Sequence, residues 1–320
     1  MVRVARQSRR GFCLCCLSVG FLAARGGWQE AEAALPPSGI VDAIMSEAAR
    51  ATIHIHALRG GVSVLEGSGG NVAVLTGPDG KLLVDAGIGV SRPQVATALE
   101  ALGPEPVTRL INTHWHFDHT SGNEWLHGSG ARILAHENTR KRLLVAQRVE
   151  DWSVEFAAPA PAAVPQDVFA TTETVRHGGS TLDLQRYDPA HTDSDISVTF
   201  REAEILHAGD TFWNGVYPMI DYSTGGSIDG MVKAAEANLA AVNEGTIVIP
   251  GHGQPVSDRA GLVAFRDMLV GARANVAAAK RRGASLDAII AERPTARWDE
   301  AWGQFVISPA LFTRLVYEGL

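Results

Sequence analysis

The chain has 320 residues, of which 46% are hydrophobic and 20% are charged, and its formal net charge is -7. This length and apolar content are sufficient for a substantial buried core, in one large domain or two small ones. Because an acidic protein repels a phosphate backbone, the composition argues against a nucleic-acid substrate or partner.

The first 33 residues are typical of an export signal. Residues 8–14 read S-R-R-G-F-C-L and resemble the twin-arginine motif, a short apolar run follows, and residues 31–33 read A-E-A, a cleavage pattern of small residues. We therefore expect residues 1–33 to be a signal peptide and the mature chain, residues 34–320, to be periplasmic or secreted. A retained N-terminal anchor is the alternative, but the apolar run is too short for stable insertion across a bilayer.

Cysteine is confined to this predicted signal, at Cys13, Cys15 and Cys16. The mature chain would therefore have neither disulfides nor thiolate ligands, and any metal must be held by histidines and carboxylates. Twin-arginine export carries folded proteins, which is compatible with metal loading before translocation.

The first half of the mature chain reads as short strands followed by helices. Apolar and β-branched runs between glycine turns predict the strands, and longer runs without such turns predict the helices. We expect strands near residues 52–58, 62–66, 71–76, 81–85, 107–113 and 132–135, and helices near residues 93–102 and 137–149.

The second half repeats this rhythm after an Ala/Pro-rich stretch at 157–165, which is expected to connect two similar halves. Strands are expected near 173–177, 181–187, 196–200, 204–207 and 246–249, and helices near 228–242 and 259–281. Two β-rich halves that each end in helices predict an α+β fold. The expected architecture is a single domain of two mixed sheets packed face to face with helices outside, a four-layer αβ/βα sandwich.

The most unusual segment is T-H-W-H-F-D-H-T at residues 113–120, which follows the strand expected at 107–113. It contains His114, His116, Asp118 and His119, and core packing of a helix or a strand does not account for so many groups that are costly to bury. A polar loop that merely contains histidines is the alternative. Side chains at the end of a strand on a rigid sheet can instead be aimed at a metal.

Three similar residues follow strands later in the chain. They are His191 in Y-D-P-A-H-T-D, Asp210 in I-L-H-A-G-D-T and His252 in I-V-I-P-G-H-G. Each of them alone is more often structural. Together with the first segment they predict a metal centre, and imidazole nitrogens with carboxylate oxygens suit zinc.

In this order, the motifs H-W-H-F-D-H, P-A-H-T, G-D-T and P-G-H-G resemble the ligand set of the metallo-β-lactamase superfamily. The resemblance implies an αββα fold and a site for two zinc ions. One zinc would be held by His114, His116 and His191, the second by Asp118, His119 and His252, and Asp210 would bridge them. Asp85 in L-L-V-D-A-G matches the superfamily's supporting aspartate, which orients the ligands.

The same resemblance implies a hydrolase in which two zinc ions share a water, lower its pKa and so provide hydroxide at neutral pH. Asp118 is expected to ligate one zinc and to orient the hydroxide, which makes it the candidate catalytic residue. The expected substrate is a small molecule with a C–N, C–O or C–S acyl bond, such as a β-lactam, lactone, ester or thioester. Asp210 stands where some lactamases have a cysteine ligand, so lactonases and thioesterases are favoured.

Two other functions stay open at this point. A non-catalytic zinc-binding protein would keep the same ligands, and a diiron oxidoreductase would hold iron in their place. Diiron members of the superfamily usually have a glutamate at the position of His116, so the sequence favours zinc.

Residues 211–227 are rich in aromatic residues and glycine, and we expect them to form a loop over the pocket. Its rings would grip an apolar substrate, and a tyrosine hydroxyl would polarise a carbonyl, unless these rings simply pack beneath the loop. The candidate substrate-binding residues are Trp213, Tyr217 and Tyr222. The other histidines are expected to be structural, with His54 and His56 on an exposed strand face and His127, His136, His177 and His207 elsewhere.

Overall fold

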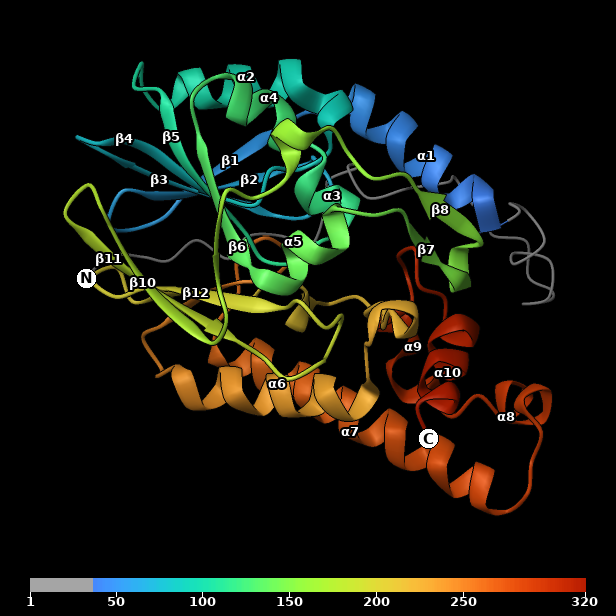
Figure 1. The fold of residues 1–320 in the computed structure, drawn as a ribbon. Helices are drawn as coiled ribbons and strands as arrows, with labels where there is room; N and C mark the ends of the chain where they lie inside the picture. Colours follow the sequence, from blue (N-terminus) through green and yellow to red (C-terminus); the bar gives the residue numbers. More distant parts are fainter. Residues whose placement is uncertain (1–36) are drawn as a thin grey trace.

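The computed structural model describes residues 37–320, so the predicted signal peptide at 1–33 lies outside the described residues. Within the described part, none of the helices has both the length and the apolar composition that a membrane span requires. The first helix, α1 (Pro37–Arg50), runs along one side of the molecule (Figure 1).

The first half forms a mixed sheet of seven strands in the order β1-β2-β3-β4-β5-β6-β9. The first four strands pair antiparallel, and β4, β5, β6 and β9 pair parallel. The strands are β1 (His54–Ala57), β2 (Val62–Glu66), β3 (Val72–Gly77), β4 (Gly80–Val84), β5 (Val107–Asn112), β6 (Arg132–His136) and β9 (Asp167–Phe169). Because parallel neighbours need crossover connections, helices separate these later strands along the chain.

The second half forms a mixed sheet of five strands in the order β10-β11-β12-β13-β15. The first four pair antiparallel, and β13 pairs parallel with β15. The strands are β10 (Thr172–His177), β11 (Ser180–Arg186), β12 (Ile196–Phe200), β13 (Ile205–His207) and β15 (Ile247–Ile249). The chain passes from one sheet to the other between β9 and β10, a few residues after the predicted connector at 157–165.

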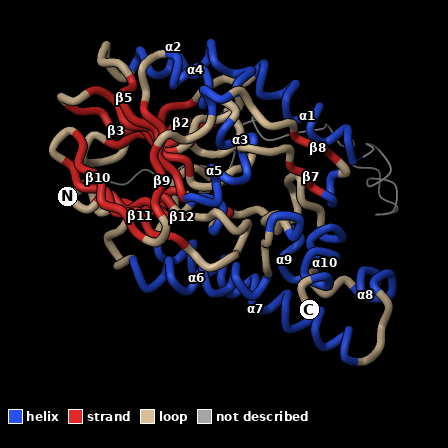
Figure 2. Tube along the Cα trace, viewed as in Figure 1, coloured by secondary structure: helices blue, strands red, loops and turns tan. Residues whose placement is uncertain are grey.

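The two sheets pack face to face, and helices cover their outer faces, which confirms the predicted four-layer sandwich (Figures 1 and 2). The core between the sheets contains apolar residues of both, such as Val64 and Val84 from the first and Leu184 and Val198 from the second. The outer helices are α2 (Arg92–Ala101), α4 (Asn123–Gly128), α6 (Ile228–Ala241) and α7 (Arg259–Arg281).

Several elements were not predicted, and one prediction was wrong. The helix expected at 137–149 ends early, as α5 (Glu137–Leu143), and the chain then forms a hairpin of β7 (Gln147–Val149) and β8 (Val154–Phe156). The unpredicted helices are α1 and α4, whose bounds are given above, and α3 (Phe117–Thr120), α8 (Leu286–Glu292), α9 (Ala296–Trp302) and α10 (Pro309–Glu318). Two very short strands, β14 (Trp213–Asn214) and β16 (His252–Gly253), pair in parallel beside the site.

Candidate metal centre

The predicted ligands come from the ends of several strands. His114 and His116 follow β5, and the single turn α3 carries Asp118 and His119. The other three come from the second half: His191 from the loop after β11, Asp210 from the turn after β13 and His252 from β16. The fold therefore brings segments that are far apart in sequence to one place.

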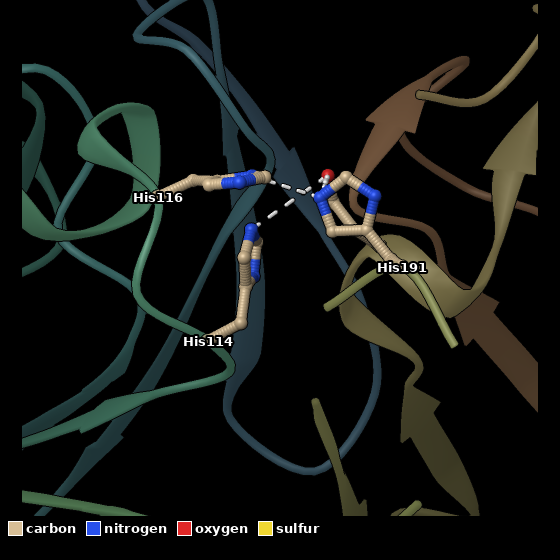
Figure 3. A group of neighbouring side chains, drawn as sticks. His114, His116 and His191 are labelled. Carbon is tan, nitrogen blue, oxygen red and sulfur yellow. Dashed lines mark hydrogen bonds and ion pairs between the residues drawn. The ribbon is translucent and has the colours of Figure 1, made fainter. Parts of the chain in front are cut away.

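All seven side chains meet there, in two groups. His114, His116, His191 and Asp210 form one group, and Asp118, His119 and His252 form the other; within each group the possible ligand atoms lie within 4.8 Å of one another. Figure 3 shows the three imidazoles of the first group pointing toward one another.

Asp210 lies between the two groups, as the expected bridging position requires. Its Oδ2 is 3.3 Å from Nε2 of His191 and 3.3 Å from Nε2 of His252, and its Oδ1 is 3.2 Å from Nε2 of His119. Gly251 makes this approach possible, because a Cβ at that position would lie 2.0 Å from Asp210 Oδ1.

Hydrogen bonds on the outer side of the rings decide which nitrogen faces the centre. His191 Nδ1 donates to the carbonyl oxygen of Met219 at 2.8 Å, and His114 Nδ1 lies 3.1 Å from Thr113 Oγ1. Since the Thr113 hydroxyl donates to Asp85, it accepts from the ring of His114. Both histidines therefore present the lone pair of Nε2 inward.

Asp85 supports the second group, in the position that the sequence suggested for it. Its Oδ2 accepts from His119 Nδ1 at 2.8 Å, and its Oδ1 accepts from the Thr113 backbone N–H at 2.7 Å. The residue has φ 68°, in the left-handed region that Asp enters more readily than most residues. This turn directly after β4 directs the carboxylate toward the site.

A second supporting carboxylate, Asp221, was missed at the level of sequence. Its Oδ2 accepts from His116 Nε2 at 3.0 Å and from the Thr224 hydroxyl at 2.6 Å. The bond to Asp221 turns Nδ1 of His116 inward, where it lies 2.8 Å from Nε2 of His191. The only sequence signal was the stretch D-Y-S-T-G at residues 221–225, a composition typical of a tight turn.

The inward-facing atoms fit a metal ion better than they fit one another. His114 Nε2 and Asp210 Oδ1 are buried and have no hydrogen-bond partner among the described residues. His119 Nε2 and His252 Nε2 face each other at 3.2 Å. Buried polar atoms normally have hydrogen-bond partners. A cluster of imidazole nitrogens and carboxylate oxygens whose lone pairs face one another therefore has the chemistry of a metal site.

The charges of the site also favour a cation. Burial lowers the pKa of His114 well below its usual value and that of His191 to about 4, so both rings are neutral ligands. Burial also disfavours the charged form of His252, but Asp210 and Asp118 outweigh it and raise its pKa to about 9. Burial opposes ionisation of Asp118 as well, yet the neighbouring histidines hold its pKa at about 2. Positive charge is therefore stabilised between the two carboxylates.

Asp118 marks the open side of the centre. Its side chain is 15% exposed, whereas those of His114 and His119 are 0% exposed and that of Asp210 is 1% exposed. The side chains of His116 and His252 are also slightly exposed, at 10% and 8%, so the side of the centre formed by these three ligands faces solvent.

Trp213 lies beside the centre but is not open to solvent. Its ring centroid is 4.2 Å from that of His252 and 6.2 Å from that of His191. The residue is only 3% exposed. Trp213 therefore packs against the ligand rings and presents almost no surface to a substrate.

The structure contradicts the predicted substrate contact of Tyr217 and gives the hydroxyl of Tyr222 another partner. Tyr217 is fully buried, stacks on Phe312 with centroids 4.4 Å apart, and donates its hydroxyl to Asp299 Oδ1 at 2.9 Å. Tyr222 donates its hydroxyl to the carbonyl oxygen of Leu315 at 2.7 Å. Both hydroxyls therefore bind the C-terminal helices and are not available to polarise a substrate carbonyl.

The remaining histidines are structural, as expected. His56 pairs with Glu66 across two strands at 2.8 Å, and His54 is exposed on the same strand. The other four each bond a backbone carbonyl oxygen: His127 that of Ala131, His136 that of Ala170, His177 that of Gly80 and His207 that of Asn71.

Comparisons with known proteins agree with this geometry. The family model of the metallo-beta-lactamase superfamily matches residues 65–265. A hydroxyacylglutathione hydrolase of Polaromonas sp. (strain JS666) is 29% identical over 149 residues, 46% of this chain and 48% of that protein. One of Rhodospirillum rubrum is 30% identical over 160 residues, 49% of this chain and 52% of that protein. The chain thus spans about half the length of these curated relatives.

Two solved structures show the same fold at low identity. A metallo-beta-lactamase from Pontibacter korlensis superposes with a TM-score of 0.55 at 19% identity, covering 68% of this chain and 99% of that one. A stereoselective inverting sec-alkylsulfatase from Pseudomonas sp. superposes with a TM-score of 0.61 at 15% identity, covering 86% of this chain and 51% of that one.

Proposed function

The chain belongs to the metallo-β-lactamase superfamily, and from that premise we propose that it is an exported dizinc hydrolase of small carbonyl compounds. The bond cleaved would be a C–N, C–O or C–S acyl bond. The observation that supports this most strongly is the convergence of seven ligands with their free atoms directed at a shared space.

The first zinc would be held by His114, His116 and His191, the second by Asp118, His119 and His252, and Asp210 would contact both. Zinc in such a site polarises a carbonyl group and lowers the pKa of water to about 7. The chain's own contribution is to orient the imidazoles through Asp85, Asp221, Thr113 and Met219.

Asp118 is the residue best placed to act on the attacking water. Its pKa of about 2 keeps it ionised at neutral pH, and its side chain is the ligand carboxylate nearer to solvent. An ionised carboxylate at that position accepts a hydrogen bond from water and orients it toward a bound carbonyl.

Thioesters are the first substrate class to test. The two relatives described above are named hydroxyacylglutathione hydrolases, and the matched segment in each is about half of that protein. Asp210 in place of a cysteine ligand is in keeping with this choice.

The experiment combines metal analysis with a substrate panel. Wild-type protein should contain two zinc ions per chain and hydrolyse at least one of S-lactoylglutathione, a homoserine lactone, p-nitrophenyl acetate and a chromogenic cephalosporin. Chelation should abolish that hydrolysis, and zinc should restore it. His191→Ala should lose at least about 100-fold in activity, whereas His54→Ala, which removes an exposed histidine, should match wild type.

Other outcomes would replace this proposal. Protein that holds two zinc ions but hydrolyses none of the panel would be a metal-binding protein without this activity. Protein that holds iron and consumes a reductant would be an oxidoreductase.

Export is the other part of the proposal, and the twin-arginine-like sequence at residues 8–14 supports it. N-terminal sequencing of protein from the periplasm should begin at Ala34. Full-length protein confined to the cytoplasm would contradict it.

A further inference from the structure

The C-terminal helices are attached to the segment that surrounds the metal centre. The backbone N–H of Tyr217 donates to the carbonyl oxygen of Trp302 at 2.8 Å, and its hydroxyl donates to Asp299. The hydroxyl of Tyr222 reaches Leu315 in α10. Residues 266–320 lie beyond the part of the chain that the family model matches, and these contacts attach that segment to the site.

That attachment fixes the connection between α9 and α10, residues 303–308. Gly303 N–H donates to the carbonyl oxygen of Asp299 at 2.9 Å, and the Ser308 hydroxyl accepts from Leu311 N–H at 3.1 Å at the start of α10. Ile307 between them is fully buried. The connection is therefore held at both ends and by a core side chain.

Phe305, in the middle of this connection, lies beside the metal ligands. Its ring centroid is 6.3 Å from that of His252 and 6.2 Å from that of Trp213. The residue is half-buried, so part of an apolar ring is exposed close to the second group of ligands.

A second apolar surface lies next to the ligands of the first half. Phe117, between His116 and Asp118 in the sequence, stacks on Phe156 of β8 with centroids 5.0 Å apart and planes 17° apart. Both rings are half-buried. The most exposed ligand, Asp118, therefore has an exposed aromatic ring as its immediate neighbour.

We propose that Phe305 is a substrate-contacting residue that selects acyl compounds with an apolar alkyl or aryl group next to the scissile carbonyl. This inference rests on the proposed hydrolase function and names its substrate class. An apolar group that covers a half-exposed ring removes both surfaces from water, and the free energy gained grows with the area covered. A carbonyl bound at the ligands would place its acyl chain within reach of these rings.

Binding of alkyl hydroxamates to zinc-loaded protein tests the inference without turnover. The hydroxamate group chelates zinc, and only its alkyl chain varies. In wild type, hexanohydroxamate should bind about 10-fold more tightly than acetohydroxamate by calorimetry, because one face of the longer chain is covered. In Phe305→Ala this ratio should fall below about 3-fold, and Phe305→Leu should restore most of it.

Hydrolysis of p-nitrophenyl acetate and hexanoate provides a second readout. Phe305→Ala should reduce kcat/KM for the hexanoate about 10-fold and that for the acetate less than about 2-fold. Val270→Ala is the matched control, because it removes an exposed apolar side chain from α7. In Val270→Ala, the affinity ratio of the two hydroxamates and the kcat/KM ratio of the two esters should equal those of wild type. Its zinc content should also be that of wild type.

The outcomes separate this inference from the proposed function. Phe305→Ala could bind acetohydroxamate as wild type does and keep the wild-type affinity ratio of hexanohydroxamate to acetohydroxamate. This result would overturn the role of Phe305 and leave the metal centre intact. Hydroxamates of both lengths failing to bind wild-type protein would refute the metal centre and, with it, both proposals.

Discussion

Asp85 and Asp221 perform the same task in two different regions of the molecule. Each accepts a hydrogen bond from the outer nitrogen of one ligand histidine, Asp85 from His119 and Asp221 from His116. Asp85 directly follows a buried strand of the first sheet. Asp221 lies in the irregular segment between β14 and α6.

The two carboxylates differ in how many of their oxygens have partners. Both oxygens of Asp85 accept hydrogen bonds, Oδ1 from the Thr113 backbone and Oδ2 from His119 and the Thr113 hydroxyl. Only Oδ2 of Asp221 is used, and its Oδ1 is buried without a partner among the described residues. An amide in place of the carboxylate should therefore be tolerated at one position and not at the other.

Asp85→Asn should have the largest effect. The Thr113 backbone N–H is a fixed donor, so the amide oxygen must face it and the amide NH₂ must face His119. That donor would force His119 into the tautomer with a proton on Nε2, the atom that should bind metal. We expect zinc affinity at the second group to fall about 100-fold, measured by competition with a fluorescent chelator.

Loss of zinc in this variant must be separated from loss of fold. Circular dichroism of Asp85→Asn should match metal-free wild type. Wild-type zinc affinity in a folded Asp85→Asn protein would show that the carboxylate does not set the tautomer of His119.

Asp221→Asn should have a smaller effect. The amide oxygen can occupy the position of Oδ2 and accept from His116 and Thr224, while the NH₂ occupies the position that has no partner. We expect zinc affinity to fall less than about 10-fold, because only the charge on the acceptor is lost. Asp221→Leu removes the acceptor altogether, so its loss should be several-fold greater; equal affinities of the two variants would contradict this account.

The same contrast explains how much of the site could be read from the sequence. Asp85 and the seven ligands come after strands that the sequence predicts, because the fold aims side chains from strand ends. Asp221 acts through a turn whose direction depends on tertiary packing. The sequence identified His116 as a metal ligand. It did not show which carboxylate accepts the hydrogen bond from the ring nitrogen of His116 that faces away from the metal.

The aromatic segment and the C-terminus show the same limit. The composition of residues 211–227 indicated rings near the pocket, but composition does not show which way a ring points. The hydroxyls of Tyr217 and Tyr222 bind helices that were not predicted, because α8, α9 and α10 are short and their formation depends on packing. The two main sheets and the helices α2, α6 and α7 were predicted correctly, since their patterns extend over enough residues, whereas α1 was missed.

Asp195 extends the comparison to a buried carboxylate whose hydrogen bonds come from Thr192. Its oxygens accept from the backbone N–H and the hydroxyl of Thr192, at 2.9 and 2.7 Å, and so fix the loop that carries His191. Burial raises its pKa to about 7, whereas His116 and Thr224 hold the pKa of Asp221 at about 2 against the effect of burial. The direct hydrogen bond from His116 thus keeps Asp221 charged, whereas the hydrogen bonds from Thr192 do not offset the burial of Asp195.

The remaining prediction concerns folding and not zinc affinity: it is a pH dependence of the free energy of unfolding of the metal-free protein. Between about pH 4 and pH 7, folded Asp195 keeps a proton that the unfolded chain has released, so its contribution to the free energy of unfolding falls as pH rises. The burial of His191 gives the opposite slope, because its folded pKa of about 4 lies below the unfolded value. Asp195→Asn removes only the pH dependence that comes from Asp195 and leaves that from His191.

The comparison of Asp195→Asn with wild type isolates the contribution of Asp195 to the pH dependence of the free energy of unfolding. Urea unfolding at pH 4.5 should show a small difference between the two proteins, and at pH 7.5 the variant should have gained about 1–3 kcal/mol relative to wild type. Parallel curves for the two proteins across this range would mean that Asp195 is ionised in the folded state. The hydrogen bonds from Thr192 would then suffice to stabilise a buried charge without an imidazole, and the contrast with Asp221 would no longer hold.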